Sequence, residues 1–227
     1  MAMNSMYQQL MRLPLFQGVS AEKITGLVEK LPFHFLKYRN GETVLSAGDP
    51  CTHIKFIVSG RMRVVTPFVN LRISLSQSLE SPHVLAAEYL FGRNTVYPFT
   101  GTAEGNCGIL QLRKSDYIKM VNSDKVFLFN ILNYLSTGSQ SSLSSVVAVK
   151  DGSVAERLAL QIESLTSHHS SNIVLHFKQK DLCTLLCTQR TTLVSTLDKL
   201  SEEGIIEYDS NNLVVLDRHA LMLRIKS

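Results

Sequence analysis

The chain reads FKQKDLCTLLCTQRTTLVSTLDKLSEEG from residue 177 to residue 204, and this stretch holds two short amphipathic patterns in succession. In both patterns the leucines recur with the spacing of one buried helix face, at Leu182, Leu185, Leu186, Leu193, Leu197 and Leu200. Only Cys187-Thr188-Gln189 separates the two patterns, and Gly204 ends the second. The stretch predicts a helix-turn-helix, whose second helix can enter the major groove of DNA.

Two β-prone runs follow directly. Ile205–Tyr208 and Leu213–Leu216 flank the polar turn Asp209–Asn212, which is typical of a β-hairpin. Helix, turn, helix and hairpin in this order predict a winged helix-turn-helix. The alternative is a helical hairpin packed on a small sheet, with no role in DNA binding.

Composition sets limits on the class of protein. The chain has 227 residues, 44% of them hydrophobic and 19% charged, which indicates folded cores in one or two domains. From Lys150 onward, 9 Lys or Arg stand against 10 Asp or Glu, so charge alone does not indicate DNA. No apolar run approaches the roughly 18 residues of a membrane span, and no signal peptide is recognisable at the N-terminus. We therefore expect a cytoplasmic protein with reduced thiols and no membrane partner.

The four cysteines, Cys51, Cys107, Cys183 and Cys187, form no CxxC pair, so no metal site is predicted. Cys183 and Cys187 are four residues apart and would share one helix face. We expect them to pack in the core, and a redox or metal role is the alternative.

The N-terminal half has the rhythm of an all-β domain, between short helices in residues 6–31 and in Lys114–Val121. The β-prone runs are Phe33–Tyr38, Glu42–Ser46, Ile54–Val58, Arg61–Val69, Leu71–Leu79, Val84–Ala87, Thr95–Ala103 and Cys107–Leu112. Short runs with turn signals between them predict a β-sandwich or roll. Such a roll can hold a small ligand or serve only as a scaffold.

A long helix is predicted from Asp124 to Lys150. Its middle is rich in serine, which favours helix poorly, so an interdomain linker is the alternative. The apolar residues stay in helical phase from Leu135 to Leu143, and this favours one continuous helix. Lys150–Ser153 is the predicted hinge, after which Ser153 should cap a helix that runs to Ser167. A solvated loop, Ser167–Ser171, follows it.

A β-roll, a long helix, a hinge and a winged helix-turn-helix in this order resemble the Crp/Fnr family of bacterial transcription regulators. The matching motifs are LFQGVS at 15–20, NGETV at 40–44, VSGRMRV at 58–64 and the exit Gly204-Ile205-Ile206. The resemblance covers nearly the whole chain. It implies an α+β fold with a cyclic-nucleotide-binding-like jelly roll as sensory domain in 1–123, a dimerisation helix in 124–150 and a DNA-binding domain in 151–227. It also implies a homodimer on a twofold-symmetric site in double-stranded DNA, acting with RNA polymerase.

Departures from the family's pattern predict that the effector is not cyclic AMP. Members that bind this nucleotide hold its phosphate with Gly-Glu at a helix start and Arg-Ser/Thr about ten residues later. Here Ala87-Glu88 keeps the glutamate, but Tyr97-Pro98-Phe99 stands where the arginine should be, and Arg93 is out of place. A buried phosphate without a cation is costly. The expected effector pocket consists of Ala87, Glu88, Arg93, Tyr97, Phe99 and Ser142.

Haem stays possible as a cofactor, because some relatives sense gases with it and histidines occur in the roll at His34, His53 and His83. The N-terminal cysteine cluster that the iron–sulfur sensors of the Fnr branch carry has no counterpart in this sequence.

The resemblance also identifies candidate DNA-binding residues. They are Gln189, Arg190, Thr191, Thr192 and Ser195 at the start of the second helix, with Lys178 and Lys180 at the start of the first. Arg190 matches the first arginine of the family's Arg-Glu-Thr-x-x-Arg opening and suits a bidentate contact to guanine O6 and N7. Thr191 and Ser195 replace the glutamate and the second arginine, so the half-site should differ from the family's familiar one. Gln189 can pair with adenine or phosphate, while Thr192 and the two lysines suit the phosphate backbone.

Two alternatives belong to other classes of function, a sensory or scaffold protein and an enzyme. A sensory or scaffold protein could use the same helix-turn-helix for protein contacts, and it would bind no duplex. An enzyme on a cupin-like roll would need clustered metal ligands, whereas His34, His53 and His83 are scattered without an HxH motif. We therefore predict no catalytic residues.

Overall fold

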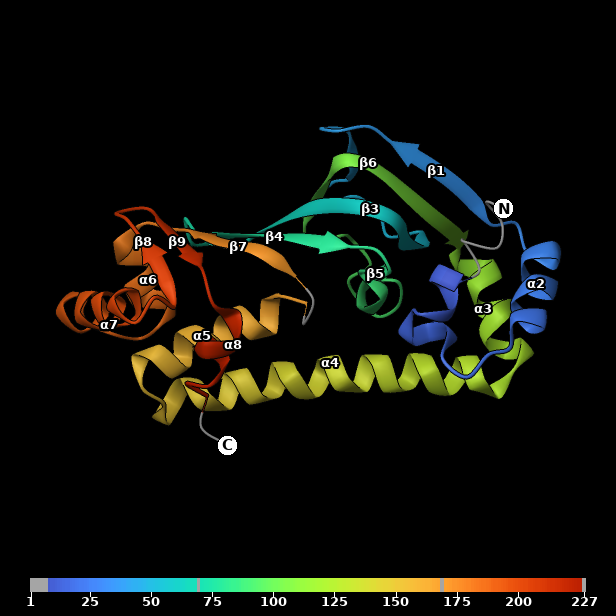
Figure 1. The fold of residues 1–227 in the computed structure, drawn as a ribbon. Helices are drawn as coiled ribbons and strands as arrows, with labels where there is room; N and C mark the ends of the chain where they lie inside the picture. Colours follow the sequence, from blue (N-terminus) through green and yellow to red (C-terminus); the bar gives the residue numbers. More distant parts are fainter. Residues whose placement is uncertain (1–7, 69, 168–169, 226–227) are drawn as a thin grey trace. The chain divides into compact units, whose positions relative to one another are not determined.

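The computed structural model describes residues 8–68, 70–167 and 170–225, drawn as a ribbon in Figure 1. The chain forms two compact units. The N-terminal unit comprises Met1–Val64 and Leu79–Gly138, and the C-terminal unit comprises Val65–Ser78 and Ser139–Ser227. The division predicted from sequence, into 1–123, 124–150 and 151–227, did not anticipate that residues 65–78 pack with the C-terminal part of the chain.

The N-terminal unit contains the predicted antiparallel roll. Its strands are β1 (His34–Tyr38), β2 (Thr43–Leu45), β3 (His53–Pro67), β4 (Ser74–Glu80), β5 (His83–Leu85) and β6 (Thr100–Arg113). Strand β6 pairs with β1 in a register that sets His34 opposite Gln111, and it also pairs with β2. Strand β3 pairs with β5, with Phe56 opposite Val84. Strands β3 and β4 extend beyond the unit, since their shared end belongs to residues 65–78.

Two predicted strand boundaries are wrong, and glycine explains both. The run Ile54–Val58 and the run predicted from Arg61 to Val69 meet in the single strand β3, which ends at Pro67; Val69 lies outside the described residues. Strand β6 likewise continues through Gly105. Gly60 and Gly105 have φ of 76° and 75°, so each strand changes direction without ending. At Gly60 the backbones also approach closely, because a Cβ there would lie 2.0 Å from the carbonyl oxygen of Asn106.

The start predicted at Thr95 for the next strand is also wrong. Strand β6 begins at Thr100, and Val96 forms only an isolated bridge to Pro50. The segment before β6 therefore does not join the sheet as a regular strand.

Short helices flank the roll, as predicted for residues 6–31 and Lys114–Val121, whereas Ala87 was predicted to end a strand and begins a 3-10 helix instead. They are η1 (Pro14–Phe16), α2 (Ala21–Lys30), η2 (Ala87–Tyr89) and α3 (Lys114–Ser123). Phe16 meets the rings of Phe56 and Phe127 edge to face, with centroids 5.7 Å and 5.8 Å away. Since Phe56 lies on β3 and Phe127 on the following long helix, these three rings join the roll to that helix.

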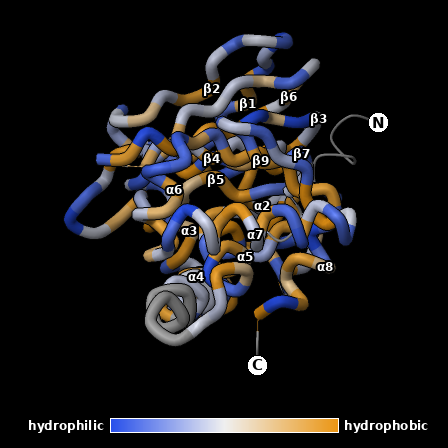
Figure 2. The backbone as a smooth tube through the Cα atoms, turned by 90° about the vertical axis from the view of Figure 1, so that its left-hand side faces the viewer, coloured by the Kyte–Doolittle hydropathy of each residue, from blue (hydrophilic) through white to orange (hydrophobic). Residues whose placement is uncertain are grey.

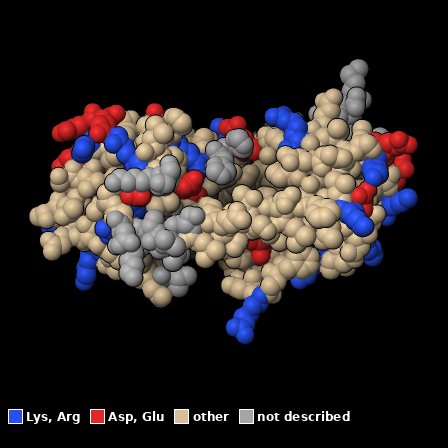
Figure 3. All heavy atoms as spheres, turned by 90° about the horizontal axis from the view of Figure 1, so that it is seen from below, with Lys and Arg blue, Asp and Glu red and all other residues tan. Residues whose placement is uncertain are grey.

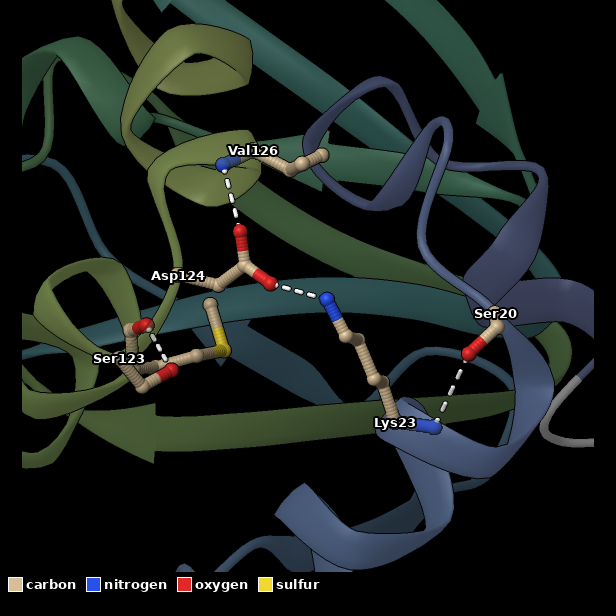
Figure 4. A network of polar contacts seen from close by, with 6 residues as sticks. Ser20, Lys23, Ser123, Asp124 and Val126 are labelled. Carbon is tan, nitrogen blue, oxygen red and sulfur yellow. Dashed lines mark hydrogen bonds and ion pairs between the residues drawn. The ribbon is translucent and has the colours of Figure 1, made fainter.

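That helix, α4 (Lys125–Asp151), is continuous. The prediction of one helix is therefore confirmed, and the alternative of an interdomain linker is wrong. At its start Asp124 accepts a hydrogen bond from the Val126 amide at 2.9 Å and pairs with the Lys23 ammonium of α2, as Figure 4 shows. Hydrogen bonding to Lys23 and to the Val126 amide lowers the pKa of Asp124. In the same network Ser20 caps α2 by accepting from the Lys23 amide, and the Ser123 hydroxyl donates to Met120.

The exposed surface of α4 carries several large apolar side chains among smaller or polar ones. Its exposed large side chains are Leu128, Phe129, Leu132 and Leu143. Between Lys125 and Lys150 the helix carries no charged residue. Seen from the side on which α4 lies, uncharged atoms cover most of the surface over its described part (Figure 3). No helix in the described ranges is long and apolar enough to cross a membrane.

The C-terminal unit is a winged helix-turn-helix, as predicted. Its elements are α5 (Val154–Leu165), β7 (Ser171–His176), α6 (Gln179–Leu185), α7 (Arg190–Glu202), β8 (Ile206–Tyr208), β9 (Asn212–Val215) and α8 (Arg218–Met222). Ser153 caps α5 by accepting from the Glu156 amide at 3.2 Å, as expected. Strand β7 and helix α8 were not predicted. Strand β7 lies between β4 and β9, so the sheet of this unit has the order β4-β7-β9-β8.

Each unit has its own hydrophobic core. In the N-terminal unit Phe16, Phe56 and Met62 are almost fully buried, and in the C-terminal unit Leu182, Leu193 and Leu213 are. Figure 2 shows hydrophobic residues gathered toward the interior and hydrophilic residues along the outer loops. Burial of such side chains stabilises a fold by about 1.5–3 kcal/mol each.

We predict that Gly60→Ala destabilises the N-terminal unit by more than about 3 kcal/mol, because backbone overlap adds to the cost of a positive φ. Gly41→Ala is the matched control, since Gly41 has a φ of 83° but nothing within 4 Å of its Cβ position. The control should cost only about 1–2 kcal/mol. Urea unfolding followed by tyrosine fluorescence measures both. Equal losses in the two variants would contradict the close approach at Gly60.

Candidate nucleic-acid interface

The turn between α6 and α7 is held by backbone hydrogen bonds. The amide of Cys187 donates to Thr184 at 3.2 Å, and that of Thr188 donates to Cys183 at 3.0 Å. Cys187 has a φ of 47°, a left-handed conformation that lets the chain leave α6 and enter α7 within a few residues. Gln189 then stands as the N-cap residue of α7.

Arg157 of α5 stabilises this turn by hydrogen bonds to its carbonyl groups. One of its guanidinium nitrogens donates to the carbonyl oxygens of Leu186 at 2.7 Å and Cys187 at 3.1 Å, and Nε donates to Gly152 at 2.8 Å. A charged donor on carbonyl groups makes a stronger hydrogen bond than a neutral one. Sequence reasoning missed Arg157, because nothing in the local pattern of α5 indicates that it reaches a turn 29 residues away.

Helix α7 has one buried and one exposed face. Leu193, Leu197 and Leu200 are almost fully buried in the core of the C-terminal unit. The predicted DNA-binding residues of this helix lie together on the exposed surface of its first turns, at Gln189, Arg190, Thr191, Thr192 and Ser195. Within the described part of the chain, the Arg190 side chain has no hydrogen bond or ion pair.

The predicted phosphate-contacting lysines lie at the start of α6. Lys178 is the N-cap residue of this helix, and both Lys178 and Lys180 are exposed. Asp181, in the same turn, pairs with Arg72 at 3.0 Å. This ion pair neutralises the nearest carboxylate, so the two lysines dominate the charge at this end of α6.

The wing is tied to both helices of the motif. Its turn is closed by Asp209, which accepts from the amides of Asn211 and Asn212 at 2.7 Å and 2.8 Å. The carbonyl of Asn211 accepts from the Phe177 amide at 2.7 Å, just before α6. The Tyr208 hydroxyl donates to Asp198 of α7, which raises the pKa of the tyrosine. Wing and recognition helix are therefore parts of one hydrogen-bonded unit.

The prediction that Cys183 and Cys187 pack together in a core is wrong for Cys187. Helix α6 ends at Leu185, so Cys187 lies past the helix, in the turn, and is exposed. Cys183 is half-buried against the core. Among the described residues, no group of three or more His, Cys, Asp or Glu could hold a metal ion.

The residues expected at an effector site lie in different surroundings. Glu88 faces α4, where it hydrogen-bonds the Tyr134 hydroxyl, and Gly138 is close by. Burial and the Glu88 carboxylate raise the pKa of Tyr134. Tyr97 is buried, its hydroxyl donates to the His53 carbonyl at 3.4 Å, and burial followed by the Cys51 thiol raises its pKa.

The other expected effector residues are spread more widely. Ala87 is buried in η2, Phe99 is half-buried against the roll core, and Arg93 is exposed. Ser142 lies on α4 beyond Gly138 and thus in the C-terminal unit. Tyr97 and Phe99, which were predicted to replace the family's arginine, are thus a buried and a half-buried ring.

The three histidines named for haem differ in their exposure to solvent. His34 is exposed on β1, and the half-buried His53 has its Nδ1 within 2.8 Å of the Thr52 hydroxyl. His83 is half-buried on β5. None of the three histidines is fully buried.

Comparison with known proteins gives two family matches. The model of the cyclic nucleotide-binding domain matches residues 35–124, and that of the Crp-like helix-turn-helix domain matches residues 154–224. No curated protein sequence gives a match.

Solved structures resemble this chain at low sequence identity. The catabolite activator protein of Thermus thermophilus is 18% identical over 93% of this chain and 97% of that chain, with a TM-score of 0.51. FixK2 of Bradyrhizobium japonicum is 14% identical over 87% of this chain and 99% of that chain, with a TM-score of 0.48.

The two family matches lie in the order that the sequence motifs indicated, and together they cover more than half of the chain. The helix-turn-helix, its wing and the roll all lie within them. The chain therefore belongs to the Crp/Fnr family of DNA-binding transcription regulators.

Proposed function

We propose that the protein is a homodimer that binds a twofold-symmetric site in double-stranded DNA, with one α7 in each of two major grooves. The observation that carries this proposal is the exposed start of α7, where Arg190 has no partner in the described part of the chain while the opposite face is buried. An exposed guanidinium without an intramolecular partner can donate two hydrogen bonds, to O6 and N7 of guanine. Thr191 and Ser195 beside it add hydroxyl contacts, and Gln189 can reach adenine or phosphate.

Residues that contact phosphate would position the protein on the duplex. Lys178 and Lys180 at the start of α6, with Thr192 on α7, are the proposed contacts. The C-terminal part of the chain is not basic overall, so few phosphates are neutralised and the dependence of binding on salt should be moderate. Specificity then depends mainly on the few side chains that reach base edges.

Dimerisation is proposed along α4. At 100° per residue, Leu128, Leu132 and Leu143 fall within about 60° of one helix face, and Phe129 borders it. A second copy of this helix would cover these side chains and remove an exposed apolar stripe from water. The small residues in the middle of α4, such as Ser136 and Ser139, leave room for the backbones to approach.

The effector is proposed to be a molecule other than cyclic AMP, bound near Ala87, Glu88, Arg93, Tyr97, Phe99 and Ser142. The support is the buried Tyr97 and the half-buried Phe99, which stand where a phosphate-binding arginine would be needed. We further propose that an effector in the domain 1–123 acts through the helix 124–150 and the hinge 150–153 on the DNA-binding domain 151–227. The regulator would work in the cytoplasm with RNA polymerase.

Arg190→Ala should weaken binding to the specific site by about 1–3 kcal/mol, or roughly 5–150-fold, because a bidentate base contact is lost. Lys178→Ala is the contrast: it should weaken binding to specific and random DNA alike and reduce the salt slope by about 1. Fluorescence anisotropy with a site selected from random DNA measures both. Unchanged specificity in Arg190→Ala would contradict the assignment.

Phe129→Asp should convert the dimer to monomer at micromolar concentration, since a charge buried in an apolar interface costs several kcal/mol. Ile118→Asp is the control, because Ile118 is 42% exposed on α3, outside the proposed interface. Sedimentation velocity distinguishes the two forms. A dimer that survives Phe129→Asp would place the interface elsewhere.

Calorimetric titration with cyclic AMP should give no binding at concentrations up to a millimolar, because no cation meets the phosphate. Micromolar affinity would show that another cation, such as Arg93, reaches the ligand.

A further inference from the structure

A hollow in the surface of the N-terminal unit is lined by polar side chains. Its volume is about 380 Å³, and the residues around it are Thr52, His53, Arg113, Lys114 and Ser115. All five belong to the N-terminal unit, and none of them was expected at the effector pocket. This hollow, called here the basic hollow, is therefore a separate feature of the roll.

Two segments that are far apart in the sequence meet at the basic hollow. Thr52 precedes β3 and His53 begins it, while Arg113 ends β6 and Lys114 begins α3. The Lys114 amide donates a hydrogen bond to the Thr52 carbonyl at 3.0 Å. The backbone therefore holds the lining side chains beside one another.

The lining carries positive charge that no neighbouring carboxylate neutralises along these two segments. Arg113 is exposed, and within the described part of the chain its side chain has no hydrogen bond or ion pair. The segments 52–55 and 111–115 contain no Asp or Glu. Asp116, which follows the second segment, is buried and pairs with Lys119 at 2.7 Å. The Arg113 guanidinium is thus available to a ligand.

His53 experiences the same concentration of positive charge. The residue is half-buried, and burial lowers its pKa. The positive charges of Lys55, Arg113 and His34 lower this pKa further. Its Nδ1 lies 2.8 Å from the Thr52 hydroxyl, and when that hydroxyl donates, the ring carries its proton on Nε2 and can donate to a ligand. Like charges that converge on one place repel one another, and an anion bound there would relieve the repulsion.

The remaining lining residues add charge and hydroxyl groups. The Lys114 ammonium lies over the ring of Phe91, 4.7 Å from its centroid, which restricts where this long side chain points. Ser115 is exposed, as is Thr52, so both hydroxyls can reach a ligand. A guanidinium, an ammonium and two hydroxyls together suit an anion with more than two acceptor oxygens, which favours phosphate over carboxylate.

We propose that the basic hollow binds the phosphate group of a small molecule that is a phosphate monoester or a pyrophosphate. The guanidinium of Arg113 makes a two-pronged contact, Lys114 adds charge, and the hydroxyls of Thr52 and Ser115 donate to the remaining oxygens. A volume of about 380 Å³ lies within the range of small-molecule sites, so the hollow has room for more than the phosphate group. The inference goes beyond the proposed function and does not depend on DNA binding.

Inorganic pyrophosphate is the probe in a titration of the full-length protein, followed by NMR of ¹³C-labelled histidine. The His53 signals should shift saturably, with half-saturation below about 1 mM. The pKa of His53 should rise in the complex, because the anion offsets the cations around the ring. His176 in the C-terminal unit is the internal control and should not shift. Shifts of His53 that do not saturate, or that sodium chloride reproduces at equal ionic strength, would overturn the proposal.

Two arginine variants separate a specific contact from general charge. Arg113→Gln should weaken pyrophosphate binding at least about tenfold, because the two-pronged contact is lost. Arg63→Gln removes the same charge from an exposed position further along β3 and should leave binding within about twofold of wild type. Equal losses in the two variants would mean attraction by net charge only and would overturn the proposal. Lys114→Gln takes the place of Arg113→Gln if the latter does not fold.

Ligands that differ in one group test the requirement for phosphate. Glucose 6-phosphate should shift the His53 signals and glucose should not, because only the former carries a phosphate monoester. Cyclic AMP has a single negative charge on its phosphodiester and should also leave His53 unchanged, in agreement with the calorimetric prediction. A shift of equal size with glucose would overturn the assignment to phosphate.

Discussion

The structure of the DNA-binding part depends on burial of one face of α7. Leu193, Leu197 and Leu200 place their side chains in a core shared with α5, α6 and residues Ile73 and Leu75. At about 2 kcal/mol for each buried leucine, this burial is the largest contribution that holds the helix in place. It also determines what the helix can do, because the residues on the opposite face then point outward. These residues are Arg190, Thr191, Thr192 and Ser195.

Polar contacts then fix the orientation that burial leaves open. Arg157 holds the turn before α7, and Tyr208 of the wing holds Asp198 near its middle. A base contact depends on placing a guanidinium to within a fraction of an ångström, and apolar packing alone allows some sliding. These hydrogen bonds, none of which involves a proposed DNA-reading residue, leave Arg190 available to the duplex.

The sequence indicated the helices well and the sheet less well, for physical reasons. Periodic leucines and Gly204 predict α6 and α7 because helix signals are local. Gly60 was predicted to end a strand, yet β3 continues through it. A glycine with positive φ occurs both in turns and in β-bulges, so the residue type does not distinguish the two. Strand β7 was missed, although Ile173 and Leu175 alternate, because a short apolar run does not identify its partner strand.

The sequence also does not show to which of the two cores a buried residue belongs. Leu75 and Leu79 are four residues apart on β4, and the alternation of the strand treats them alike, but they lie in different clusters. The difference is set by contacts with residues about 100 positions away, as between Leu75 and Leu175. The effector residues show the same limit, since the motif located Glu88 but not its hydrogen bond to Tyr134 on α4.

The most direct measurement is dimethyl sulfate footprinting on a DNA site selected by the protein. This reagent methylates guanine N7 on the floor of the major groove, the atom that Arg190 should contact. The account predicts two protected guanines, related by twofold symmetry and about one helical turn or a multiple apart, with protection lost in both half-sites for Arg190→Ala. Protection that is unaffected by Arg190→Ala, or confined to a single half-site, would contradict it.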